Sequence, residues 1–136
     1  MKAERYLEQI GKIDELIENK RSEQMRCNEM ASSMGAFSTD DRVQSTPNPH
    51  KMTDAIDRSI DLANEIKVLQ NRRADIIHTL EQLPKAEYSI LYQFYVENKL
   101  LKEVAVIHKK SYSWVCHNKT IALKALQKIL DDRKKG

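Results

Sequence analysis

The chain has 136 residues with three glycines and three prolines, and charged side chains make up 32% of it. This composition is typical of amphipathic helices whose charged sides face water, so we predict an all-α fold with at most two modules. No apolar run approaches the roughly 20 residues that span a bilayer, and the amino terminus is charged from its second residue. We therefore expect a cytoplasmic protein that is neither secreted nor inserted in a membrane.

The sequence lacks the usual motifs of metal, cofactor and catalytic chemistry. Cys27 and Cys116 lie far apart, with no CxxC and no histidine at metal-ligand spacing, so we expect two reduced thiols. There is no glycine-rich phosphate loop, HExxH or GxSxG motif. We expect no enzyme activity, no metal and no cofactor.

The two parts of the chain differ in charge. Residues 1–83 hold 12 Lys and Arg against 15 Asp and Glu, whereas residues 84–136 hold 11 against 5. A basic module next to a mildly acidic arm is the pattern expected when one end of a protein binds a polyanion. The alternative is that the charges serve solubility alone.

Residues 1–34 have the apolar spacing of a long helix that packs along one side. The seam positions follow steps of four and three, and two polar residues in its middle weaken the packing expected there. The predicted seam consists of Tyr6, Ile10, Ile13, Ile17, Lys20, Gln24, Cys27, Ala31 and Met34.

From about residue 35 to 52 this periodicity gives way to turn residues, which predict a loop. A second long helix should begin near Thr53 or Asp54, because both can act as N-caps. Its seam consists of Leu62, Ile66, Leu69, Arg73, Ile76, Leu80 and Leu83. The two helices predict a long antiparallel hairpin over residues 1–83.

Four apolar residues of the second helix, Ile56, Ile60, Val68 and Ile77, lie off its seam and need another surface. Either the carboxy-terminal module packs on them, or the arm associates with another copy or another protein. Long hairpins without a third helix are marginal alone, so we expect a homo-oligomer through residues 1–83.

Residues 84–136 predict a compact helical module. Pro84 suits the start of a short helix that buries Ile90, Leu91, Phe94 and Tyr95. A second short helix, "LLKEVAVIH", is followed by the turn "KKS", in which the Ser111 hydroxyl can accept the N–H of Ser113 or Trp114. A third helix, from about Tyr112 to Leu130, would then cross the second as in a helix-turn-helix.

Such a module places the first turns of its last helix in the major groove of duplex DNA. The residues there that can contact bases are Tyr112, Trp114, His117 and Asn118. The two aromatics fit a core or an interface equally well, and a lone histidine is usually just solvated. The candidate phosphate contacts are Lys109, Lys110, Ser113, Lys119 and Lys124.

The segments "ILYQFYVENKLLKEVAVIH" and S-Y-S-W-V-x6-AL-x2-L, after "LP" at 83–84, resemble region 4 of sigma-70-type factors. With the hairpin and the "DDRVQSTPNPHK" loop, the whole chain is similar to sigma-region-4-like proteins encoded by phages and prophages of Firmicutes. It is more distantly similar to RinA and ArpU late-transcription activators. The resemblance implies a transcription regulator in the bacterial host cytoplasm that binds duplex DNA and contacts RNA polymerase. It implies the same four base-contacting residues, but not a complete sigma factor.

The chain departs from these relatives in two places. Many of them carry glycine where this chain has Lys109, so Lys109 is expected to be left-handed at a cost of roughly 1 kcal/mol. They also tend to carry more arginine in the recognition helix. Two other functions remain open: a small terminase subunit that marks viral DNA for packaging and assembles as a ring, and a helical adaptor that binds protein alone.

Overall fold

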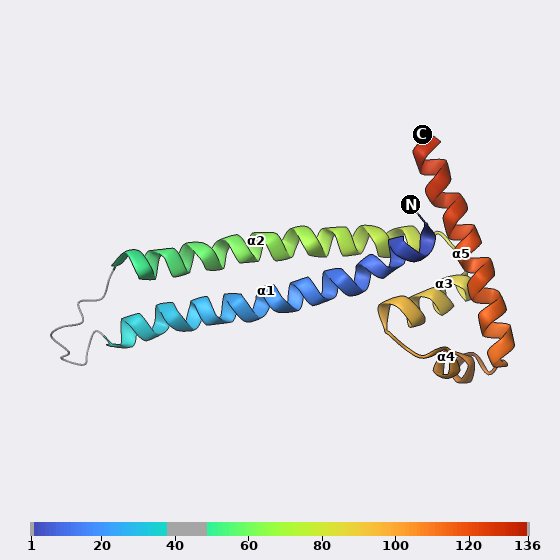
Figure 1. Ribbon diagram of the computed structural model, residues 1–136, viewed down its shortest axis with the longest axis horizontal. Helices are drawn as coiled ribbons and strands as arrows, with labels where there is room; N and C mark the ends of the chain where they lie inside the picture. The colour runs from blue at the N-terminus through green and yellow to red at the C-terminus, as the bar shows by residue number, and fades with distance from the viewer. Residues whose placement is uncertain (1, 38–48, 136) are drawn as a thin grey trace. The chain divides into compact units, whose positions relative to one another are not determined.

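The structure is a computed structural model that describes residues 2–37 and 49–135. These residues form five α-helices and one π-helical segment, η1, with no strand among them (Figure 1). The predicted all-α fold class is confirmed. The elements are α1 (Ala3–Phe37), α2 (Pro49–Leu80), α3 (Lys85–Leu91), η1 (Tyr92–Val96), α4 (Leu101–His108) and α5 (Tyr112–Lys135).

The chain divides into two compact units, residues 14–71 and residues 1–13 together with 72–136. The first turns of α1 and the end of α2, which the sequence assigns to the arm, therefore belong to the same unit as α3, α4 and α5. The functional boundary at residue 83 stays a prediction.

In the unit of residues 14–71, α1 and α2 pair through apolar and polar contacts. Ile17, Ala55, Leu62, Ile66 and Leu69 are its buried apolar residues. Lys20 Nζ donates to Glu65 Oε2 at 3.0 Å, and Gln24 Nε2 donates to the Ser59 carbonyl oxygen at 3.2 Å. As the residue numbers rise along α1, those of the partners fall along α2, so the two segments run in opposite directions within this unit.

The predicted start of the second helix is wrong, because α2 begins at Pro49 and Thr53 and Asp54 lie inside it. Proline suits the first turn of a helix, where its missing N–H would have no intrahelical acceptor. The bounds predicted for the loop, about 35–52, are also wrong, since α1 continues to Phe37 and α2 begins at Pro49. One glycine at Gly35 costs a helix only about 1 kcal/mol and does not end it. Residues 38–48, with most of the "DDRVQSTPNPHK" segment, lie outside the described residues.

The second unit has its own core. Leu7 and Ile10 of α1, Ile76 and Leu80 of α2, Ile90 and Leu91 of α3, Val104 of α4, and Val115, Ala122 and Leu126 of α5 are nearly or fully buried. The Tyr6 hydroxyl donates to the hydroxyl of buried Thr79 at 3.0 Å, and the Ala3 N–H donates to Gln127 Oε1 at 2.7 Å. These contacts tie the start of α1 to α2 and α5. The predicted seam placed Tyr6 inward, whereas Leu7 takes the fully buried position.

The short helix predicted after Pro84 is split in the structure. Its α-helical part ends at Leu91, and η1 follows, with the Glu97 N–H donating to the Tyr92 carbonyl five residues back at 3.0 Å. Asn98 has φ 57°, and the Lys99 N–H reaches the Gln93 carbonyl at 2.9 Å. Asparagine tolerates this left-handed position, which ends the helix and satisfies a terminal carbonyl.

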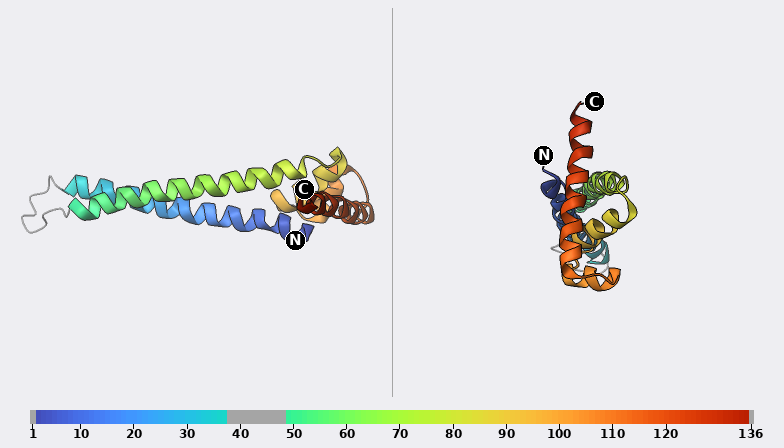
Figure 2. Two further views of the ribbon diagram at one scale, coloured as in Figure 1. Left: turned by 90° about the horizontal axis from the view of Figure 1, so that it is seen from above. Right: turned by 90° about the vertical axis from the view of Figure 1, so that its right-hand side faces the viewer.

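The turn between α4 and α5 matches the sequence prediction. Lys109 is left-handed, with φ 57° and ψ 42°, and the Lys110 N–H donates to the Ala105 carbonyl at 3.0 Å. The Trp114 N–H donates to the Ser111 hydroxyl at 3.1 Å, which confirms the predicted cap. α4 packs against α5, and the right view of Figure 2 shows it beside the end of α5 at which that helix begins.

Candidate nucleic-acid interface

The helix α5 has one buried side and one exposed side. Val115, Ala122, Leu126 and Leu130 are buried. Ser113, His117, Thr120 and Lys124 are exposed and follow one another in steps of four, three and four, so they lie on one side of the helix, opposite the core. We call these four residues the α5 stripe.

The α5 stripe lies in a basic segment. Residues 109–128 contain five lysines and neither aspartate nor glutamate. Lys109, Lys110, Lys124 and Lys128 are exposed, as are Ser111 and Ser113. Two lysines in the turn and two further along the helix therefore place positive charge at both ends of the α5 stripe.

The four predicted base contacts do not share one environment. His117 belongs to the α5 stripe, and Tyr112, at the first position of the helix, is 53% exposed. Trp114 packs against the buried cluster of Ile90, Val104, Ala105 and Val115. Asn118 is half-buried, and its Nδ2 donates to the Trp114 carbonyl oxygen at 2.8 Å. The structure thus brings His117 and Tyr112 to the surface. Trp114 and Asn118 lie on the side of α5 between the α5 stripe and the buried core.

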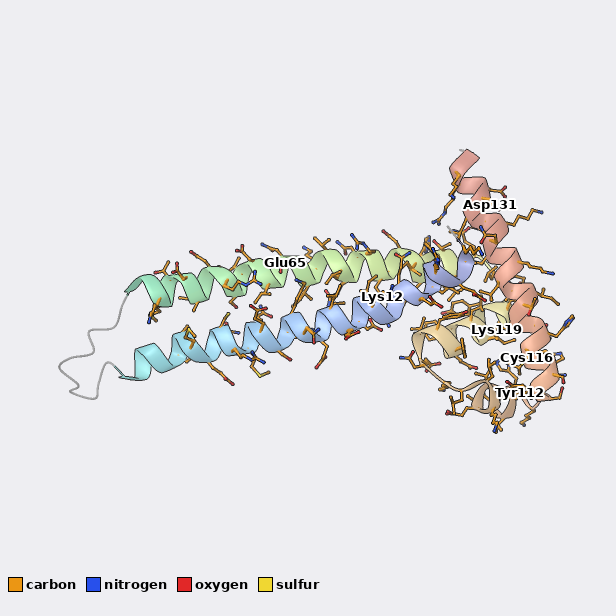
Figure 3. The ribbon with its side chains drawn as sticks, viewed as in Figure 1. Lys12, Glu65, Tyr112, Cys116, Lys119 and Asp131 are labelled. Carbon is orange, nitrogen blue, oxygen red and sulfur yellow. The ribbon has the colours of Figure 1, made fainter. Side chains whose placement is uncertain are left out.

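Tyr112 and Cys116 lie one helical turn apart on α5 (Figure 3). A hydrogen bond with the Cys116 thiol raises the pKa of the Tyr112 hydroxyl above its ordinary value. The protonated hydroxyl can donate or accept a hydrogen bond.

The five predicted phosphate contacts also differ in exposure. Lys109, Lys110, Ser113 and Lys124 are exposed, and Lys110 Nζ lies 5.5 Å from the centre of the Trp114 ring. Lys119 is half-buried, with its Nζ 4.3 Å from the centre of the Phe94 ring. A cation held over an aromatic ring is attracted by the ring quadrupole, so Lys119 joins α5 to η1. Figure 3 shows Lys119 on the side of α5 that faces the rest of its unit.

The aromatic pair under Lys119 is itself well packed. The rings of Phe94 and Tyr95 meet edge to face, with centroids 4.9 Å apart. Burial, together with the carboxylates of Glu4 and Glu8, raises the pKa of Tyr95 to about 12. Its hydroxyl stays neutral at physiological pH, and η1 presents an uncharged surface to α5.

The described residues show neither a metal site nor a membrane-spanning helix. Residues 2–37 and 49–135 contain no cluster of histidine, cysteine, aspartate or glutamate that could hold a metal ion. None of the helices within these ranges has the length and apolar character needed to cross a membrane.

Comparison with known proteins does not identify a family. No family model matches the chain, and neither the curated proteins nor the solved structures give a significant match.

Sequence reasoning missed Thr120 and the separation of Trp114 and Asn118 from His117. The spacing of the apolar residues Val115, Ala122 and Leu126 in the sequence could have predicted both. That spacing fixes which side of α5 is buried and turns the opposite side, with Thr120, toward solvent.

Proposed function

We propose that the chain is a DNA-binding transcription regulator of the phage type, in which α4, residues 109–111 and α5 form a helix-turn-helix. The observation that carries this proposal is the α5 stripe, a polar and basic surface on a helix whose opposite side is buried. A helix held in this way is rigid, and its exposed side fits the major groove of duplex DNA. No catalytic step is part of this function.

Base reading falls to the amino-terminal half of α5. His117 can donate to or accept from a base edge, and Ser113 can do either through its hydroxyl. Tyr112 lies beside them and adds an aromatic ring that can contact a thymine methyl group. In this proposal Tyr112, Ser113 and His117 give the preference for a DNA site.

Phosphate binding falls to the exposed lysines at the two ends of the α5 stripe. Lys109 and Lys110 precede α5, and Lys124 follows the reading residues by two turns. Their ammonium groups attract the DNA backbone without distinguishing bases, so they set affinity and position.

Trp114, Asn118 and Lys119 act in the proposal as positioning residues. Trp114 packs against the core of its unit, and the Lys119 ammonium contacts the Phe94 ring of η1. The Asn118 side chain donates to the Trp114 carbonyl within α5. Loss of Trp114 or Lys119 should disturb DNA binding through the orientation of α5.

The proposal includes RNA polymerase as a partner and the bacterial cytoplasm as the place of action. Both rest on the resemblance to sigma region 4. Val106 and Ile107 of α4 are exposed and offer an apolar surface that a protein partner would cover. The antiparallel pairing in residues 14–71 supports a helical hairpin that acts as an association arm.

Fluorescence anisotropy with labelled random-sequence duplexes tests the proposal. The affinity of the intact protein should fall steeply between about 50 and 200 mM salt, because each phosphate contact releases counterions. Selection from a random duplex pool should then enrich one sequence. Absence of DNA binding at low salt would contradict the proposal and favour a helical adaptor.

A further inference from the structure

The helix α2 has a second side, mostly apolar, that its packing on α1 leaves exposed. Ile56 and Ile60 are 44% and 55% exposed, whereas the seam residue Leu62 is fully buried. Ile56, Ile60, Ala63 and Lys67 follow one another in steps of four, three and four, so they share one side of the helix. We call these four residues the α2 stripe.

The charges beside the α2 stripe are separated by sign along the helix. The exposed Asp57 lies beside its amino-terminal half, and the exposed Lys67 lies at its carboxy-terminal end, whereas Asp54 and Asp61 lie on another side of the helix. The other charged pair of this segment lies on the side that faces α1. There Arg58 Nε is 3.4 Å from Glu23 Oε1, and Glu65 binds Lys20.

We propose that the α2 stripe binds the α2 stripe of a second copy of this chain, with the two α2 helices antiparallel about a two-fold axis. In this register Ile60 packs on the partner's Ala63, whose small side chain permits close approach. Asp57 lies beside the partner's Lys67, and two-fold symmetry forms this ion pair twice. A parallel arrangement would place like charges together, which disfavours it.

The surface fits a second copy because its apolar and charged parts complement each other within one helix. A partner of different sequence would have to supply the same pattern in reverse. The α2 stripe lies within residues 14–71 and the proposed DNA contacts lie on α5. The inference therefore rests on the association arm of the proposed function, names its partner, and is tested without DNA.

Sedimentation velocity of the intact protein, on the order of 10 to 100 µM, provides the test. The wild type should form a dimer. Ile60→Glu should weaken the dimer by at least about tenfold, because it places a carboxylate in the apolar contact. Ile60 is largely exposed in each chain, so this variant should keep the helical circular dichroism of the wild type.

A charge exchange makes the test specific for a second copy. Asp57→Lys alone should weaken association, and Asp57→Lys combined with Lys67→Asp should restore it, because the ion pair is re-formed in reverse. Glu18→Lys, which makes the same change of charge at an exposed position of α1, is the matched control and should leave association unchanged.

Three results would overturn the inference: a wild-type monomer throughout this range, a dimer that Ile60→Glu does not weaken, or a double variant that stays as weak as Asp57→Lys. Anisotropy with random duplexes, measured on the same proteins, keeps the two proposals apart. A wild-type protein that binds DNA but does not associate contradicts the dimer alone. A wild-type dimer that does not bind DNA contradicts the proposed function alone.

Discussion

The left-handed conformation of Lys109 makes glycine the better residue at that position. A side chain at φ 57° and ψ 42° brings its Cβ close to the following carbonyl oxygen, and glycine has no Cβ. The hydrogen bond from the Lys110 N–H to the Ala105 carbonyl at 3.0 Å requires this turn. Lys109→Gly should therefore keep the turn and remove its steric cost.

The expected gain follows from two opposing contributions. The left-handed conformation costs a residue with a Cβ roughly 1–2 kcal/mol. Glycine loses more conformational freedom on folding, which lowers the free energy of unfolding by roughly 0.5–1 kcal/mol and offsets part of the steric gain. The net increase in the free energy of unfolding should be about 0.5–1 kcal/mol, which for a chain of this size raises Tm by about 1–4 °C.

Urea denaturation followed by circular dichroism measures this change. Lys109→Ala is the matched control, because it removes the same charged side chain and keeps the Cβ, so its stability should stay within about 0.5 kcal/mol of the wild type. Both variants should weaken binding to random DNA equally, since both lose the same phosphate contact. A Lys109→Gly protein no more stable than Lys109→Ala would refute the steric argument.

Three further substitutions test the core and the aromatic surface. Trp114→Ala should lower the free energy of unfolding by about 2–4 kcal/mol in urea denaturation, because the ring packs on a buried cluster. Tyr6→Phe, measured in the same way, should cost about 1 kcal/mol through the lost hydrogen bond to Thr79. Folding raises the pKa of Tyr95 from 10.0 to about 12, so the folded state binds the proton more tightly. Stability should therefore fall as the pH rises across this interval, and Tyr95→Phe should reduce that fall in alkaline denaturation.

The features of the fold that the sequence predicted best are those that depend on residues close together in the chain. The Ser111 cap depends on one hydroxyl three residues before the N–H from which it accepts, and the left-handed Lys109 was expected from the resemblance to proteins that carry glycine at that position. The helix class followed from composition and from apolar spacing that repeats over many turns.

Features that depend on contacts distant in sequence were missed. The π-helical segment begins at Tyr92, in a stretch with no residue that breaks a helix, and its aromatic side chains pack with Lys119 of α5. The direction of Trp114 likewise depends on Ile90 and Val104, which come from other helices. The start of α2 was misplaced because Thr53 and Asp54 can cap a helix, and Pro49 can begin one four residues earlier.

The central proposal is that the α5 stripe binds DNA, with His117 reading bases and Lys124 binding phosphate. A comparison of His117→Ala with Lys124→Ala tests it most directly. Anisotropy would measure the affinity of each variant for the selected site and for random duplexes. His117→Ala should cost about 1–3 kcal/mol on the selected site and change random binding little, because a base contact is lost. Lys124→Ala should weaken both and reduce the salt slope by about one, because a phosphate contact carries no base information. A folded His117→Ala protein that keeps the wild-type preference for the selected site would contradict the claim.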